Sequence, residues 1–227
     1  MSRVVVVSGA NGQLGSVVVQ RFLDAGDLVV GLVRKSSSEI SVEGYIEMDV
    51  NLLDETQCQE AIERIVAGNG RLDVAVLTAG GFAMGDLDST GSIALENQYN
   101  LNFVTAYNIA RPVLNQMIQQ DKGRIFLIGS KAGLDVSKAK STIAYALAKS
   151  LVFRLAEIFN GIAKGKNIVT SVVVPSVIDT PQNRMDMPDA DFSGWVTTNQ
   201  IADNIFYYCS DEADSLRFPV LHIYNRS

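Results

Sequence analysis

The sequence predicts an α/β protein with a doubly wound sheet of seven parallel strands and helices on both faces. Two observations lead to this expectation. Short runs in which every residue is apolar, such as Val4 to Val7 and Val172 to Val174, are typical of strands that are buried on both faces of a parallel sheet. Segments with apolar residues at helical spacing separate these runs, as in a chain that alternates strands and helices.

The first part of the chain is expected to hold four strands, at Val4 to Val7, Leu28 to Val33, Tyr45 to Met48 and Val74 to Leu77. Apolar residues three and four apart, among them Val18 and Phe22, place a helix after the first strand, and the segment 24–27 ends it. A second such stripe, which includes Ile62 and Ile65, places a helix between the third and fourth strands.

The rest of the chain continues the alternation. A long helix from about Ile93 to Gln119, in which Pro112 should produce a kink or a break, precedes a strand at Arg124 to Ile128. A further helix, a strand at Ile168 to Val174, a helix at about Asn199 to Ser210 and a strand at about Arg217 to Tyr224 complete it. Right-handed crossovers then give one Rossmann-type domain over residues 1–227. Residues 175–198 show no period and are expected to form a substrate lid.

Composition excludes several functions. The net charge of -6 argues against binding of nucleic acid, which needs a basic face. The apolar runs are too short to cross a bilayer, and the start of the chain has no apolar signal region, so we expect a cytoplasmic protein. The acidic cluster Asp186, Asp189 and Asp191 has no histidine or cysteine nearby, so we expect a solvated loop and no metal site.

Two motifs carry the chemistry. Gly9, Gly12 and Gly15 follow the first strand and allow a backbone turn to approach a pyrophosphate at a helix N-terminus, although an ordinary strand-to-helix turn is the alternative. Tyr145 and Lys149 are four residues apart on one helix face, where the ammonium can lower the pKa of the phenol. A surface pair is the alternative for this spacing.

Together these motifs resemble the short-chain dehydrogenase/reductase family over essentially the whole chain. The segments 79–83, 134–135, 145–149 and 179–195 resemble its dihydropteridine reductase branch. The resemblance implies an enzyme that transfers hydride from a nicotinamide cofactor to a C=O or C=N bond of a small molecule. The alternatives are a broad carbonyl reductase or alcohol dehydrogenase, which Ser130 and Arg34 favour, and a redox sensor that binds NADPH without turnover.

The resemblance also implies roles for four residues. Tyr145 is the expected proton donor, and Lys149 the cation that assists it and holds the nicotinamide ribose. Ser130 is expected to hydrogen-bond the substrate oxygen. Asn102 best matches the asparagine that anchors a relay water, with Asn100 as the alternative residue and a solvated helix asparagine as the alternative role.

The expected cofactor is NADP(H), with NAD(H) as the alternative. A strand that ends in an acidic residue selects NAD, whereas this chain has Arg34 and Lys35 there, which can pair with a 2′-phosphate unless they form a solvated basic loop. Asp49 matches the adenine-contacting aspartate, and an N-cap is the alternative. The expected cofactor-binding set is Gly9, Asn11, Gly12, Gln13, Leu14, Gly15, Arg34, Lys35, Asp49, Val50, Ala79, Gly80, Gly81, Tyr145, Lys149, Pro175, Val177 and Thr180.

Aromatic and thioether side chains near the predicted site are candidates for contact with the substrate. Phe82, Met185 and Trp195 could pack over a flat ring, although ordinary lid packing explains the last two nearly as well. The resemblance also implies a homodimer or homotetramer built on the two long helices that contain Asn102 and Tyr145.

Overall fold

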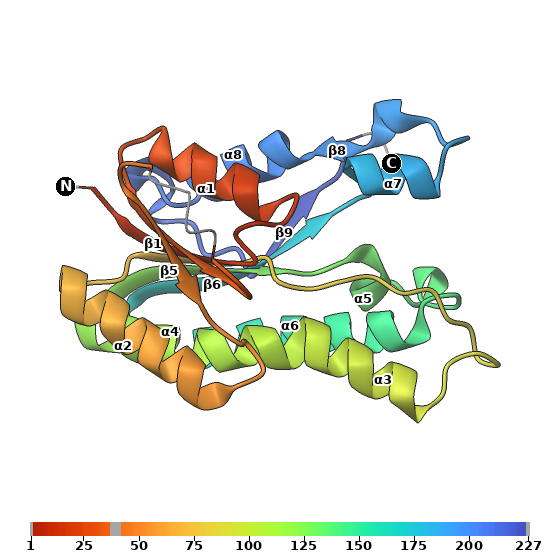
Figure 1. The fold of residues 1–227 in the computed structure, drawn as a ribbon, viewed down its shortest axis with the longest axis horizontal. Helices are drawn as coiled ribbons and strands as arrows, with labels where there is room; N and C mark the ends of the chain where they lie inside the picture. Colours follow the sequence, from red (N-terminus) through yellow and green to blue (C-terminus); the bar gives the residue numbers. More distant parts are fainter. Residues whose placement is uncertain (1, 37–41, 226–227) are drawn as a thin grey trace.

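The computed structural model describes residues 2–36 and 42–225, and within them a seven-stranded parallel sheet forms the centre (Figure 1). The strands lie in the order β3 (Tyr45–Asp49), β2 (Leu28–Val33), β1 (Val4–Ser8), β4 (Val74–Leu77), β5 (Lys122–Ile128), β6 (Asn167–Pro175) and β9 (Val220–Ile223). Each neighbouring pair is parallel. The order reverses between β1 and β4, so the predicted doubly wound sheet is confirmed.

Helices cover both faces of this sheet (Figure 1). One face carries α1 (Gly15–Leu23) and α8 (Thr198–Tyr207), and the other carries α2 (Glu55–Asn69), α4 (Thr105–Gln120) and α6 (Ile143–Ile162). The shorter helices are α3 (Ser92–Tyr99), α5 (Lys131–Leu134) and α7 (Pro181–Asp186), with 3₁₀ turns at Val136–Lys138, Phe192–Gly194 and Asp211–Ala213. No helix in the described ranges is both long and apolar enough to span a bilayer.

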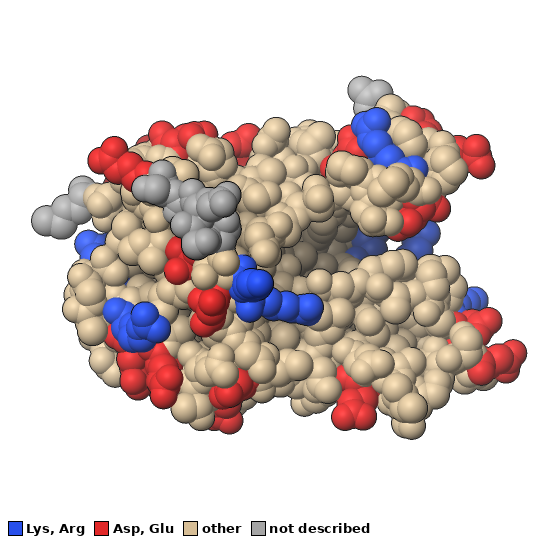
Figure 2. Space-filling view, viewed as in Figure 1, with Lys and Arg blue, Asp and Glu red and all other residues tan. Residues whose placement is uncertain are grey.

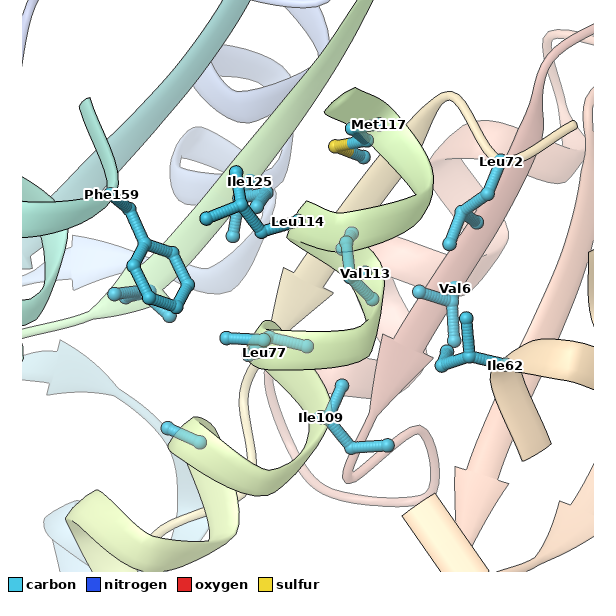
Figure 3. Close-up of a cluster of buried hydrophobic side chains, with 14 of the residues drawn as sticks. Val6, Ile62, Leu72, Leu77, Ile109, Val113, Leu114, Met117, Ile125 and Phe159 are labelled. Atoms are coloured by element: carbon cyan, nitrogen blue, oxygen red, sulfur yellow. The ribbon is translucent and has the colours of Figure 1, made fainter. Parts of the chain in front are cut away.

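Two apolar clusters hold these layers together, one on each face of the sheet. Val6 packs in the cluster under α2 and α4, where Figure 3 shows it near Ile62 and Val113. Val5 and Val7 point the opposite way, into the cluster that contains Phe22. Each fully buried aliphatic side chain stabilises the fold by about 1.5–3 kcal/mol. Successive side chains of β1 thus pack into the clusters on opposite faces of the sheet, which explains why every residue of the run is apolar.

The long helix predicted before β5 forms, but its irregular turn is not at the proline. A π-helical turn at Asn100–Val104 joins α3 to α4. Pro112 lies inside α4 and is buried, so the expected break there is wrong. Burial of the apolar face of α4 against the sheet offsets the backbone hydrogen bond that a proline cannot donate.

The segment expected to be an aperiodic lid has short elements of its own. Strands β7 (Ile178–Asp179) and β8 (Val196–Thr197) pair in parallel, and α7 lies between them in the sequence. Arg184 of α7 forms an ion pair with Asp179 at 2.6 Å, and its guanidinium lies 4.7 Å from the ring centroid of Phe192. This small unit extends beyond the carboxyl end of the sheet, above α5 in Figure 1.

Candidate active site

The predicted site residues gather at the carboxyl ends of the strands. Figure 2 shows the surface hollowed there, between the part that carries α7 and β8 and the part that carries α5 and the start of α6. The strand order reverses between β1 and β4, and in open α/β sheets ligands bind beyond the carboxyl ends of the strands at such a point.

The β1–α1 connection is a tight turn that requires glycine. Gly9 has a φ of +67°, a conformation that favours glycine, and its carbonyl accepts a hydrogen bond of 2.9 Å from the backbone N–H of Gly12. A Cβ on Gly15 would lie 2.1 Å from the oxygen of Gly9. Asn11, Gly12 and Gln13 are exposed at the tip. Helix α1 has no side-chain cap, and although the N–H of Ser16 donates to the carbonyl of Gly12, the positive end of the helix faces the turn and suits an anion.

The turn after β2 carries the two predicted cations. Arg34 and Lys35 are exposed, and the carboxylate of Asp49 accepts a hydrogen bond from the backbone N–H of Ser36. Asp49 is not the N-cap of the next helix, because the Asp54 side chain accepts hydrogen bonds from the first turn of α2. The loop therefore places cationic side chains beside the end of β2 and leaves Asp49 tied to its backbone.

The structure brings Tyr145, Lys149 and Ser130 together. The Ser130 side chain hydrogen-bonds that of Tyr145, and this bond lowers the pKa of the phenol, while burial, the larger effect, raises it. The Lys149 ammonium lies 5.8 Å from the centroid of the Tyr145 ring and donates a 2.7 Å hydrogen bond to the carbonyl of Ile128. Burial lowers the pKa of Lys149 to about 8. A phenol, a hydroxyl and an ammonium thus meet in one place.

Asn102 lies in the π-helical turn, and its amide holds the chain that follows β4. Its Oδ1 accepts from the N–H of Gly81 at 3.1 Å, and its Nδ2 donates to the Gly81 carbonyl at 2.9 Å. A Cβ on Gly80 would lie 2.8 Å from Oδ1 of Asn102 and 3.5 Å from Nζ of Lys149. The segment 79–81 therefore passes between Asn102 and Lys149.

Gln98 was missed by the sequence reasoning. It is buried, and its Oε1 accepts a 3.0 Å hydrogen bond from Nδ2 of Asn102. This contact fixes which way the Asn102 amide faces. The spacing of four residues on a helix was the available signal, because side chains at that spacing are neighbours.

The segment after β6 contains the remaining predicted residues. Ser176 is 9% exposed, and its hydroxyl has no hydrogen-bond partner among the described residues. Thr180 caps α7 by accepting from the N–H of Asn183 at 3.2 Å, and Val177 accepts from the N–H of Val196 at 2.9 Å. These contacts fix the segment at the edge of the hollow.

The three predicted substrate contacts lie in different settings. Phe82 is exposed, and its ring meets the Tyr145 ring edge to face with centroids 5.1 Å apart. Met185 is exposed on α7. Trp195 is buried and packs on Phe192 with ring centroids 4.7 Å apart. Its ring therefore contributes to packing within the lid. In the described part of the chain, no three metal-ligating side chains gather.

Comparison with known proteins places the chain in a family. A family model described as short chain dehydrogenase matches residues 3–190. Dihydropteridine reductase from Dictyostelium discoideum is 27% identical over 229 residues, which cover 95% of this chain and 90% of that protein. 3-Ketodihydrosphingosine reductase from Bacteroides thetaiotaomicron is 28% identical over 132 residues, which cover 58% of this chain but only 48% of that protein.

A solved structure shows the same fold over nearly the full length. The structure of ElxO with NADP bound has a TM-score of 0.89 at 25% identity and covers 98% of this chain and 97% of that chain. This similarity agrees with the doubly wound sheet. With the family model matched over residues 3–190, the chain belongs to the short chain dehydrogenase family of oxidoreductases.

Proposed function

We propose that the chain is an NADP(H)-dependent reductase that transfers hydride to a C=O or C=N bond of a small molecule. The observation that carries the proposal is the grouping of the Tyr145 phenol with the Ser130 hydroxyl and the Lys149 ammonium at the carboxyl edge of the sheet. A proton donor with a hydrogen-bond partner and a nearby cation is what reduction of a carbonyl requires.

The residues at the carboxyl ends of β1 and β2 fit a dinucleotide. A side chain at Gly9 or Gly15 would clash with neighbouring backbone, so the turn keeps its tight shape. The N-terminus of α1, which has no side-chain cap, lies behind this turn and suits a diphosphate. Arg34 and Lys35 would pair with a 2′-phosphate, which favours NADP(H) over NAD(H). ElxO, the structural neighbour, has NADP bound. The side chains of Leu14 and Val50 are buried, so these two residues would contact the cofactor through their backbone atoms.

The protein's own side chains manage the proton. The nicotinamide, when bound, supplies the hydride. Burial raises the pKa of Tyr145, so the phenol is protonated at neutral pH and can donate a proton to the substrate. The Ser130 hydroxyl and the Lys149 ammonium then stabilise the phenolate that remains, because Lys149, with a pKa of about 8, is charged at neutral pH.

Replacement of Tyr145 by phenylalanine tests this mechanism. We expect Tyr145→Phe to lower kcat by about 10²–10⁴-fold, since general acid catalysis contributes that much. NADPH affinity, measured by fluorescence titration, should stay within a few fold of the wild type. Full activity in this variant would refute the assignment, and loss of NADPH binding would show that the residue serves the cofactor instead.

For the substrate, we propose a quinonoid dihydropterin first, as in the dihydropteridine reductase of Dictyostelium discoideum. Carbonyl reduction is the second candidate, and the hydrogen bond between Ser130 and Tyr145 favours it. NADPH oxidation with a quinonoid dihydropterin, run beside a ketone and a quinone, distinguishes them. Tight NADPH binding without turnover on any of these compounds would instead indicate a redox sensor.

We also propose one domain with residues 175–198 as its lid, and assembly into a homodimer or homotetramer through α6 and the long helix that contains Asn102, of which α3 is the first part. Apolar side chains form a groove between these helices, among them Leu95, Tyr99, Leu147 and Leu151. A second copy of the chain would cover it. Light scattering that shows a monomer at working concentration would remove the oligomer proposal.

A further inference from the structure

Large exposed apolar side chains occur on the segments that border the hollow at the carboxyl edge of the sheet (Figure 2). Six of them are between 44% and 83% exposed, namely Phe82, Met84, Leu87, Leu134, Val136 and Met185. They come from the three segments that follow β4, β5 and β6, which border the hollow in Figures 1 and 2. Apolar side chains gathered on a rim cost solubility and commonly mark a binding surface.

This apolar rim is continuous with the candidate proton donor. Phe82 meets the Tyr145 ring edge to face, as described above. Three residues further on, at Gly85, the segment is fixed to the start of the Tyr145 helix. The N–H of Gly85 donates to the carbonyl of Ser141 at 2.8 Å, and the N–H of Ile143 donates to the carbonyl of Gly85 at 2.9 Å. Phe82 and Met84 therefore keep their position relative to Tyr145.

The charges on the same three segments are mostly negative. Residues 78–91 carry two aspartates and no lysine or arginine. Residues 129–142 carry three lysines against one aspartate, and residues 176–197 carry four aspartates against Arg184, which is already paired with Asp179. The three segments together have four cations and seven aspartates, a net charge of -3. The rim as a whole therefore disfavours a polyanion, although its three lysines all lie on one segment, residues 129–142.

From the rim and its charge we infer that the substrate is uncharged and carries an apolar group next to the reacting bond, and that it is not presented on coenzyme A or on an acyl carrier protein. The inference rests on the proposed reductase function. Acetoacetyl-CoA reductase from Acinetobacter, a relative 26% identical over 189 residues, is named for a substrate that carries several phosphate charges, so the two proteins differ in this respect.

A matched set of substrates tests the inference. NADPH oxidation is followed with 3-oxoacyl thioesters of N-acetylcysteamine, which are uncharged, and with the same acyl groups on coenzyme A, and with methyl ketones of increasing chain length. We expect kcat/KM to rise by about threefold for each methylene that becomes buried. Each uncharged thioester should exceed its coenzyme A counterpart by at least about tenfold, and added salt should narrow this gap by screening the repulsion.

Two variants locate the effect. Met84→Ser and Val136→Ser remove apolar area from the rim without touching the core, and we expect both to flatten the rise with chain length. Tyr207→Ser is the matched control, because Tyr207 is 50% exposed at the end of α8, away from the carboxyl edge of the sheet. It should leave the chain-length dependence unchanged.

The outcomes separate the two proposals. If short ketones are reduced but kcat/KM is flat with chain length, or if the coenzyme A thioesters are the better substrates, the inference is overturned while the reductase function stands. If none of these compounds and no quinonoid dihydropterin is reduced, the proposed function fails, and binding of the apolar compounds still decides the inference. An equilibrium-dialysis titration with long methyl ketones measures this binding without relying on Trp195, which is buried in the lid. Absence of binding in that titration overturns the inference as well.

Discussion

Replacing Lys149 by methionine should make the stability of the protein less dependent on pH. The ammonium is 5% exposed, and burial lowers its pKa from 10.5 to about 8. At about 1.4 kcal/mol for each pKa unit, the buried charge destabilises the fold at pH 7 by about 3 kcal/mol. Methionine is uncharged and of similar length, so the variant avoids this cost.

The sign follows from proton binding. Between pH 8 and about 10.4 the unfolded chain holds a proton on Lys149 that the folded protein has lost, so the stability of the wild type rises with pH in this window. Relative to Lys149→Met, the wild type should gain about 2–3 kcal/mol between pH 7 and pH 10. The variant also lacks the hydrogen bond from Lys149 to the carbonyl of Ile128. This loss changes the difference in unfolding free energy between the two proteins at each pH more than it changes how that difference depends on pH.

Urea unfolding of both proteins without cofactor, at pH values from 7 to 10, measures the effect. Other groups titrate in both proteins, so the difference between the two curves isolates Lys149. If the two free energies of unfolding run parallel with pH, Lys149 has an ordinary pKa in the folded protein. The phenolate of Tyr145 would then be assisted by a cation that stays charged well above pH 8.

Three further substitutions test the cofactor site and the buried Asn102 amide. Arg34→Asp should lower the ratio of kcat/KM for NADPH to that for NADH by at least about tenfold, through loss of a charge-assisted contact, and an unchanged ratio would count against a 2′-phosphate site. Gly15→Ala places a Cβ 2.1 Å from a backbone oxygen of its own turn and should weaken NADPH binding by at least about tenfold, whereas Gly68→Ala, with open space around it, should not. Gln98→Leu removes one acceptor of the buried Asn102 amide, which keeps its hydrogen bond to the Gly81 carbonyl, and should lower the free energy of unfolding by about 0.5–1.5 kcal/mol in a urea titration, so a variant as stable as the wild type would contradict that role.

Strong local signals made the sheet predictable. The strand Leu28–Val33 lies where the sequence placed it, because a fully apolar run between turn residues has few other uses. Ser130 and Tyr145, both named as site residues from the sequence, hydrogen-bond each other although they are 15 positions apart, more than the usual family spacing. Helix α5 and the 3₁₀ turn at Val136–Lys138 take up the extra length.

Other features left no readable signal. The residues of the turn at Asn100–Val104 read as ordinary helix, since nothing in their composition distinguishes a π turn from an α turn. From the sequence, Asp49 could contact the adenine or cap the next helix. Asp54 forms that cap instead, because it directly precedes the helix. Both depend on local backbone geometry that neighbouring elements impose.

The π turn before α4 makes this site sensitive to chain length. A π turn holds one residue more than an α turn, so the helical phase of α3 differs from that of α4 by about 100°. Deleting one residue from 100–104 would restore a regular helix and rotate Asn102 away from Gly81, even if every other residue were kept. A substitution in this helix changes one side chain. A single insertion or deletion instead rotates α3 relative to α4 and so moves Asn102 away from the segment 79–81 that it holds.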